Sequence, residues 1–149
     1  MGNDVMSLYS RRLLDLAGNV PLTGRLDAPQ GSAARRAPQC GSSVKVELDV
    51  TDGRVSRFGQ TVRACALGQA SAALLGAQVL GADRATIAAG RDAMRALLQD
   101  GTAPAAPWEA LEVLRPARDF RNRHASILLN WEATLAAMDA AAARAGKVG

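Results

Sequence analysis

Two cysteines and one histidine are the residues of this chain best suited to metal or sulfur chemistry. Cys40 and Cys65 are the only cysteines among the 149 residues, and His124 is the only histidine. Two thiols and an imidazole form a ligand set that suits zinc or iron. Their separations match no short zinc-finger spacing, however. The alternative interpretation is that Cys65 is a small core residue and that His124 caps a helix or faces solvent among the neighbouring arginines.

Cys65 lies where a predicted strand runs directly into a predicted helix. Residues 66–74 are apolar nearly all round and rich in alanine, glycine and serine, which predicts a buried and closely packed helix. The first turn of a helix carries the positive end of its dipole and attracts negative charge. A thiolate is the form of cysteine that binds metals, so this position favours chemistry at Cys65.

A small antiparallel sheet is predicted between the two cysteines. Apolar and charged residues alternate over residues 44–50, which is the period of a half-buried strand, and Asp52-Gly53 is a strong hairpin signal. We expect a return strand over residues 54–58, a bulge at Gly59 and a third strand over residues 60–65. The fold class predicted is therefore α+β, with a three-stranded antiparallel meander near residues 44–66 packed against several helices on one face.

This meander would place Cys40 before its first strand and Cys65 after its third. The two thiols would then lie at opposite edges of the sheet in chain order. The loop before Cys40 would have to fold over the sheet to bring them together.

Helices are predicted on both sides of the sheet segment, and residues 23–36 are predicted to form a loop. The last helix should pack against the helix that follows Cys65. The predicted helices are residues 8–16, ended by Gly18; a helix capped by Asp83 with Ile87, Met94, Leu97 and Leu98 on its apolar face; residues 108–114, closed by Pro116; and an alanine-rich helix reached through residues 117–131 and running to about residue 145.

Length and composition limit the classes of protein to which this chain could belong. A chain of 149 residues predicts one domain, and a net charge of +4 without an evident aromatic stacking platform does not favour nucleic-acid binding. We expect no membrane span, because no apolar run reaches the required length, and no export signal, which predicts a cytoplasmic protein with free thiols rather than a disulfide. A hydrolase is not expected, because the chain lacks a Gly-x-Ser-x-Gly elbow and has a single histidine, and we expect no enzyme activity.

Three sequence motifs, in order, resemble the U-type iron–sulfur cluster assembly scaffold family (IscU and the NifU N-terminal domain). The first is Ala-Pro-Gln-Cys40-Gly, the second is Ala-Cys65-Ala-Leu-Gly-Gln-Ala-Ser-Ala-Ala-Leu, and the third is His124-Ala-Ser-Ile-Leu. The resemblance covers residues 8–140 and implies a single scaffold domain spanning residues 1–149. It also implies that Cys40, Cys65 and His124 bind iron or a [2Fe–2S] cluster, with a cysteine desulfurase and apo-acceptor proteins as partners.

Two positions depart from the family pattern. Ala125 stands where the family often has a third cysteine, and Ser42 stands where an aspartate follows the Cys-Gly pair. The family uses three thiolates with an aspartate or histidine, so only Cys40, Cys65 and His124 carry over. A fourth ligand would come from solvent, Ser42 or a partner; histidine ligation of a cluster has precedent in Rieske centres. We expect the two sulfurs to lie about 4 Å apart in a metal-bound form.

Two other functions fit the same residues. A sulfur-transfer adaptor would need one reactive thiol, and Cys65 would serve. A paralogue that binds zinc, or no metal, would act through protein contacts.

Overall fold

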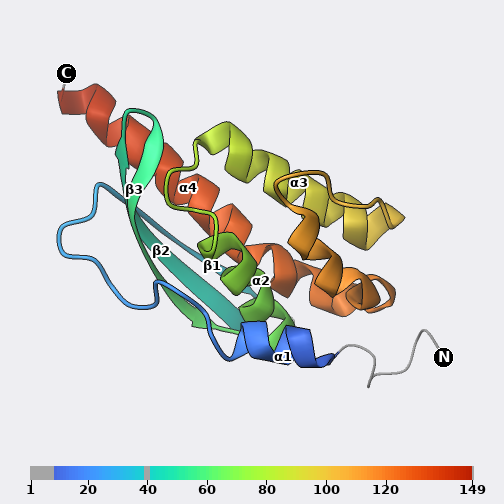
Figure 1. The fold of residues 1–149 in the computed structure, drawn as a ribbon. Coiled ribbons are helices and arrows are strands. Elements are labelled where there is room, and N and C mark those ends of the chain that lie inside the picture. Colours follow the sequence, from blue (N-terminus) through green and yellow to red (C-terminus); the bar gives the residue numbers. More distant parts are fainter. Residues whose placement is uncertain (1–8, 39–40, 149) are drawn as a thin grey trace.

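The computed structural model describes residues 9–38 and 41–148 and shows an α+β fold, as predicted. Three antiparallel strands in the order β1–β2–β3 form one layer, and the long helix α4 packs along β1 and β2 (Figure 1). Helices α2 and α3 lie beside α4. The strands are β1 (Gly31–Ala37), β2 (Ser42–Thr51) and β3 (Arg54–Arg63), and the helices are α1 (Arg11–Ala17), α2 (Ala66–Gly76), α3 (Arg84–Asp100), the 3-10 helices η2 (Glu109–Asp119) and η3 (Arg121–Arg123), and α4 (His124–Val148).

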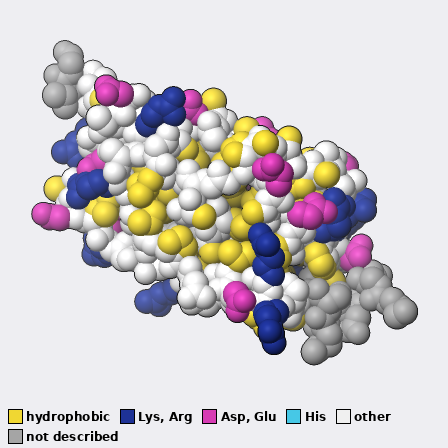
Figure 2. Space-filling model, in the orientation of Figure 1, with side chains coloured by type: hydrophobic (Ala, Val, Ile, Leu, Met, Phe, Trp, Pro, Cys, Tyr) yellow, Lys and Arg dark blue, Asp and Glu magenta, His cyan; other side chains and the backbone are white. Residues whose placement is uncertain are grey.

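The surface carries both signs of charge. On the face drawn in Figure 2, Lys and Arg side chains are interspersed with Asp, Glu and apolar side chains rather than gathered into one field. Within residues 9–38 and 41–148, no helix combines the length and apolar character needed to cross a bilayer. The face drawn in Figure 2 therefore offers no continuous basic track of the kind that follows a nucleic-acid backbone.

The predicted loop over residues 23–36 is wrong in its second half, because β1 begins at Gly31. β1 reads Gly-Ser-Ala-Ala-Arg-Arg-Ala and lacks the β-branched residues that indicate a strand. It forms because it pairs along β2 and lies under α4. A Cβ at Gly31 would lie only 2.1 Å from Ala137 O, so glycine permits this close approach of strand and helix.

The predicted division of residues 54–65 into two strands is also wrong. β3 is one strand, and Gly59 pairs in register with Glu47 instead of forming a bulge. The register shift between β2 and β3 lies at Asp49 and Val50. Gly59 is required for a different reason: a Cβ there would lie 2.6 Å from Gly24 O, in the loop that crosses it.

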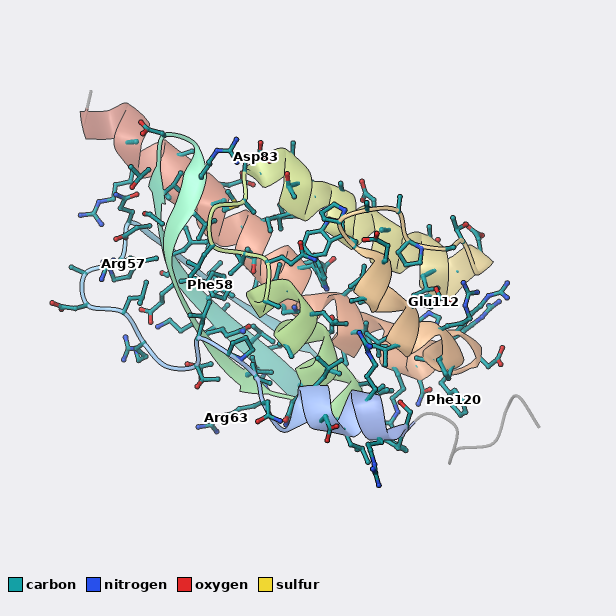
Figure 3. All side chains as sticks on the ribbon, viewed as in Figure 1. Arg57, Phe58, Arg63, Asp83, Glu112 and Phe120 are labelled. Carbon is teal, nitrogen blue, oxygen red and sulfur yellow. The ribbon has the colours of Figure 1, made fainter. Side chains whose placement is uncertain are left out.

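The Asp52-Gly53 hairpin is confirmed, and it separates two ends of the sheet. Both turn residues have positive φ (55° and 76°), as a type I′ turn requires. Near this end, Val55 N donates to Ala82 O, and Asp83 caps the start of α3. Figure 3 shows Asp83 far from Arg63, which ends β3 at the opposite end of the sheet.

Most predicted helices are confirmed, with two corrections, the first being that α1 begins at Arg11 rather than at residue 8. Ser10 Oγ accepts from Leu13 N (3.1 Å) at the start of α1, and Asp83 Oδ1 accepts from Thr86 N (2.8 Å) at the start of α3. The predicted helix over residues 108–114 is instead the longer 3-10 helix η2, and Pro116 lies inside it. Pro116 does not close this helix: it removes one N–H donor, and turns with i to i+3 hydrogen bonds lie on both sides of it, with Leu111 N donating to Trp108 O and Phe120 N to Ala117 O.

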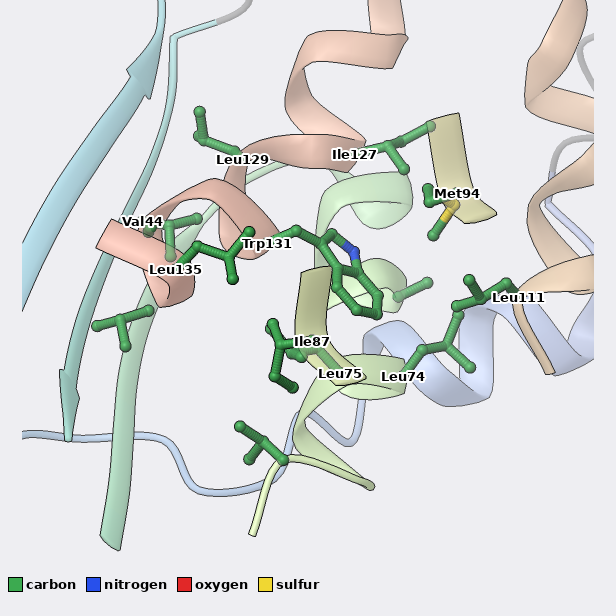
Figure 4. Packing of buried hydrophobic residues seen from close by; sticks show 14 of the residues in the cluster. Val44, Leu74, Leu75, Ile87, Met94, Leu111, Ile127, Leu129, Trp131 and Leu135 are labelled. Atoms are coloured by element: carbon green, nitrogen blue, oxygen red, sulfur yellow. The ribbon is translucent and has the colours of Figure 1, made fainter. Parts of the chain in front are cut away.

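The core is centred on two tryptophans. Trp131 of α4 is fully buried among apolar residues of α2, α3 and η2 (Figure 4), and its ring meets Trp108 edge to face at 5.0 Å. Gly90 of α3 faces both rings, since a Cβ there would lie 2.5 Å from Trp131 Cζ3 and 2.7 Å from Trp108 Cε2. The helices therefore pack closely around these rings.

The predicted packing of α4 on α2 is confirmed. Ser71 Oγ of α2 donates to Ile127 O of α4 (2.6 Å), and Trp131 Nε1 donates back to Ser71 Oγ (2.9 Å). This contact holds the first turns of α4 against α2, which places the start of each helix at the same end of the sheet.

Candidate functional site

The candidate site lies at the end of the sheet where β2 begins and β3 ends. Ser43 pairs with Arg63 across the two strands, so the entry to β2 lies beside the exit of β3. The expectation that the two cysteine segments start at opposite edges is therefore wrong. The physical reason is that the unpredicted strand β1 makes β2 the central strand, which pairs with β3 directly.

Cys40 itself lies outside the described residues. Among the described residues that flank it, Ala37 pairs with Ser42, and Gly41 N donates to Ala37 O (2.9 Å). Gly41 has φ of 72°, a conformation that favours glycine. The predicted Cys40–Cys65 sulfur separation remains a prediction.

Cys65 is the N-cap residue of α2, as its position at the strand-to-helix junction predicts. Its backbone is extended (φ −66°, ψ 171°), its thiol is free and half-buried, and its side chain makes no capping hydrogen bond. Gln69 N donates to its carbonyl oxygen (2.9 Å), which fixes the backbone in the first turn of α2. The backbone at Cys65 is thus fixed, and the residue remains partly accessible.

A buried serine that the sequence did not single out joins the three segments. Ser126 Oγ of α4 lies 3.8 Å from Cys65 Sγ and 2.9 Å from Ser42 Oγ. Ser42 and Ser126 are 3% and 1% exposed. The sequence offers one signal for Ser126, since it is a single hydroxyl residue followed by the apolar Ile127 and Leu128. Such a residue does not identify its hydrogen-bond partner.

His124 is the first residue of α4, two positions before Ser126. Its Nε2 lies 3.0 Å from Ala117 O and 3.1 Å from Arg118 O. Carbonyl oxygens only accept, so Nε2 carries a proton, and the neutral ring then has its lone pair on Nδ1. The ring therefore contacts the carbonyls at the end of η2, as the capping alternative predicts, while keeping one nitrogen able to coordinate.

An open cleft of about 590 Å³ borders His124. Two of its arginines, Arg118 and Arg121, make no ion pair within the part of the chain that the structure describes. Their charges lie at the edge of the site and favour an anionic occupant or partner. The cleft is lined by Leu98, Gln99, Arg118, Asp119, Arg121 and His124.

The two departures from the family pattern lie in different environments. Ala125 is exposed at the start of α4, whereas Ser42 is buried and bonded to Ser126. Among the described residues, which do not include Cys40, no three His, Cys, Asp or Glu side chains form a group able to hold a metal ion.

Comparisons with known proteins agree with the fold and the motifs. No family model and no curated protein sequence matches the chain. A solved NifU-like N-terminal protein from Brucella abortus, described as nitrogen-fixing, has 36% sequence identity and a TM-score of 0.88, covering 93% of this chain and 97% of its own.

A more distant structure shows the same fold at lower identity. A putative iron–sulfur cluster assembly scaffold protein for the SUF system from Fervidobacterium islandicum AW-1 has 15% identity and a TM-score of 0.81, covering 91% of this chain and 99% of its own. Taken with the three motifs and the 36% identity, the likeness places this chain in the U-type iron–sulfur cluster assembly scaffold family, the family of IscU and NifU-like proteins.

Proposed function

We propose that this protein assembles or carries an iron–sulfur cluster for transfer to other proteins. The cargo would be iron or a [2Fe–2S] cluster held by Cys40, Cys65 and His124, and a cysteine desulfurase would supply the sulfur. Apo-acceptor proteins would receive the cargo. The role proposed is that of a cytoplasmic carrier without catalytic activity, since free thiols persist in a reducing compartment.

One observation supports this proposal above the others: three segments far apart in sequence meet around the Cys65 sulfur. The entry to β2 brings Ser42, the start of α4 brings Ser126, and the two hydroxyls and the sulfur lie in one row. Cys40 precedes Ser42 by two residues, and His124 precedes Ser126 by two. The segments that precede Ser42 and Ser126 carry Cys40 and His124, so this meeting of segments supports the proposed ligand set.

The orientation of His124 adds support. Histidines that bind metals usually donate their second ring N–H to a carboxylate or a backbone carbonyl, which fixes the tautomer. His124 Nε2 faces two such carbonyls. Nδ1 is then the atom proposed to coordinate iron, without a proton to displace.

Anaerobic reconstitution with ferrous iron and sulfide tests the proposal. We expect the wild-type protein to retain iron after desalting and to absorb in the visible range, and Cys40→Ala, Cys65→Ala and His124→Ala each to retain about tenfold less. Gln99→Ala is the matched control, because Gln99 lines the cleft beside His124 and is not a proposed ligand.

The result also separates the other two functions. Wild-type protein that retains no iron contradicts the scaffold proposal. In that case, zinc retention would indicate the zinc-binding paralogue. Persulfide formation on Cys65 after incubation with a cysteine desulfurase would indicate the sulfur-transfer adaptor.

A further inference from the structure

The Cys65 sulfur, the Ser126 hydroxyl and the Ser42 hydroxyl form a chain of contacts, which we call the row. Ser126 Oγ lies between Cys65 Sγ, at 3.8 Å, and Ser42 Oγ, at 2.9 Å. Both serines are almost completely buried, whereas Cys65 is half-buried. The row therefore runs from the protein interior towards the accessible thiol.

The chemical state of the sulfur fixes the direction of its contact with Ser126. Each hydroxyl has one hydrogen to donate. A sulfur that is a thiolate or is bound to a metal only accepts, so the hydrogen of Ser126 must point to Cys65. Ser126 Oγ is then free to accept the hydrogen of Ser42.

We propose that Ser126 is a positioning residue for Cys65, donating to its sulfur in the thiolate or metal-bound form while Ser42 donates to Ser126. The functional value of this arrangement rests on the proposed role of Cys65 as a ligand. A protonated Cys65 can make the same contact as the donor, so the contact does not require bound metal.

Packing holds Ser126 in place. A Cβ at Gly68 would lie 2.8 Å from Ser126 Oγ, so the absence of a side chain at Gly68 leaves room for that oxygen and no more. The adjacent contact of Ser71 with Ile127 O fixes the backbone of α4 one residue further on. The donor is therefore preorganised rather than recruited from solvent.

The row also gives a physical role to one departure from the family pattern. An aspartate at position 42 would be a carboxylate that only accepts, and it would compete with the sulfur for the single hydrogen of Ser126. Serine at this position can donate instead. Ser42→Asp is therefore expected to weaken the Ser126–Cys65 contact.

Infrared spectroscopy of the S–H stretching band tests the contact without any metal. The Cys40→Ser variant leaves Cys65 as the single thiol. We expect Ser126→Ala in this background to shift the band to higher wavenumber, because the thiol loses its acceptor. Thr134→Val is the matched control, since Thr134 is a buried hydroxyl of α4 that donates to Asn130 O within its own helix (2.7 Å).

Zinc affinity, measured by chelator competition on the chain with both cysteines, tests the consequence. We expect Ser126→Ala to weaken zinc binding about three- to tenfold and Ser42→Ala to weaken it less, because one charge-assisted hydrogen bond is lost or loosened. An S–H band unchanged in Ser126→Ala, or shifted equally in Thr134→Val, overturns the proposal. Wild-type protein without zinc affinity counts against the metal role of Cys65, while the band still decides whether Ser126 contacts the thiol.

Discussion

Helices α2 and α4 meet through two serines with different surroundings. Ser71 of α2 is enclosed: it donates to a backbone oxygen of α4 and accepts from Trp131, both in the core. Ser126 of α4 bonds a second hydroxyl and lies against a half-buried sulfur. One contact lies wholly within the core, whereas the other reaches a half-buried side chain of the candidate site.

This difference predicts that the contact at Ser71 mainly determines stability, whereas the contact at Ser126 mainly affects binding at Cys65. The contact at Ser71 and Trp131 joins α2, α3, η2 and α4 into one core, so damage there should unfold the protein. The contact at Ser126 is expected to change binding at Cys65 while leaving most of the core packing intact. Variants ordered by their effect on unfolding test this separation.

Trp131→Ala is expected to have the largest effect. It removes a fully buried ring that meets Trp108 and leaves Ser71 without its donor. Loss of a buried aromatic side chain to alanine costs about 3–5 kcal/mol. Urea unfolding followed by circular dichroism measures the loss; a change below about 1 kcal/mol would mean that this contact is not the centre of stability.

Gly68→Ala should have an intermediate effect and should affect both contacts. The added methyl would lie 2.8 Å from Ser126 Oγ and 2.8 Å from Ala64 Cβ. Overpacking of this kind costs about 1–3 kcal/mol. We also expect the S–H band of Cys65 to shift, measured as above; destabilisation without a band shift would show that Ser126 is not held by this packing.

An element of this fold could be predicted from the sequence only where a local residue pattern specifies it. The β2 strand and its hairpin follow from alternation and Asp52-Gly53, and the cap at Asp83 follows from a local hydrogen bond. In contrast, β1 has alanines and arginines without a period, because its strand conformation is imposed by pairing with β2 and by α4. A local pattern cannot report an element that only tertiary contacts stabilise.

The site shows the same limit. Cys65 and His124 could be singled out from the sequence, because they are rare residue types at predicted helix starts. Ser126 is not, because its partners lie 61 and 84 residues away in sequence and only the fold joins them. The edge assignment of Cys40 failed for a related reason: missing β1 shifted the order of the strands.

Arg57→Ala should have a smaller effect than the core variants, far from both contacts. Arg57 donates to the Asp49 carboxylate, and this hydrogen bond holds the pKa of Asp49 below its ordinary value. A depressed pKa in the folded state means that the pair stabilises the fold above that ordinary value and that its contribution is lost as pH falls through the folded pKa.

The measurement is the difference in Tm between wild type and Arg57→Ala across pH. We expect the variant to melt lower at about pH 7 and the difference to shrink as pH falls below the ordinary carboxyl value of 3.8, because the Asp49 carboxylate becomes protonated as pH falls through its folded pKa. A difference that is constant with pH would assign the effect to lost packing of the arginine rather than to its charge.

Ala125→Cys should have the smallest effect on stability and the most informative effect on binding. Ala125 is exposed at the start of α4, so the substitution is expected to change the free energy of unfolding by less than about 0.5 kcal/mol. It would place a thiol beside His124, where the family often has its third cysteine. Iron retention after anaerobic reconstitution should rise above that of wild type, because a thiolate replaces a site that the wild-type chain leaves to solvent or a partner. Ala140→Cys is the control, an equally exposed thiol on α4 about 22 Å further along the helix. Equal iron retention in the two variants would mean that added thiols bind iron without regard to place, and that the start of α4 is not part of the site.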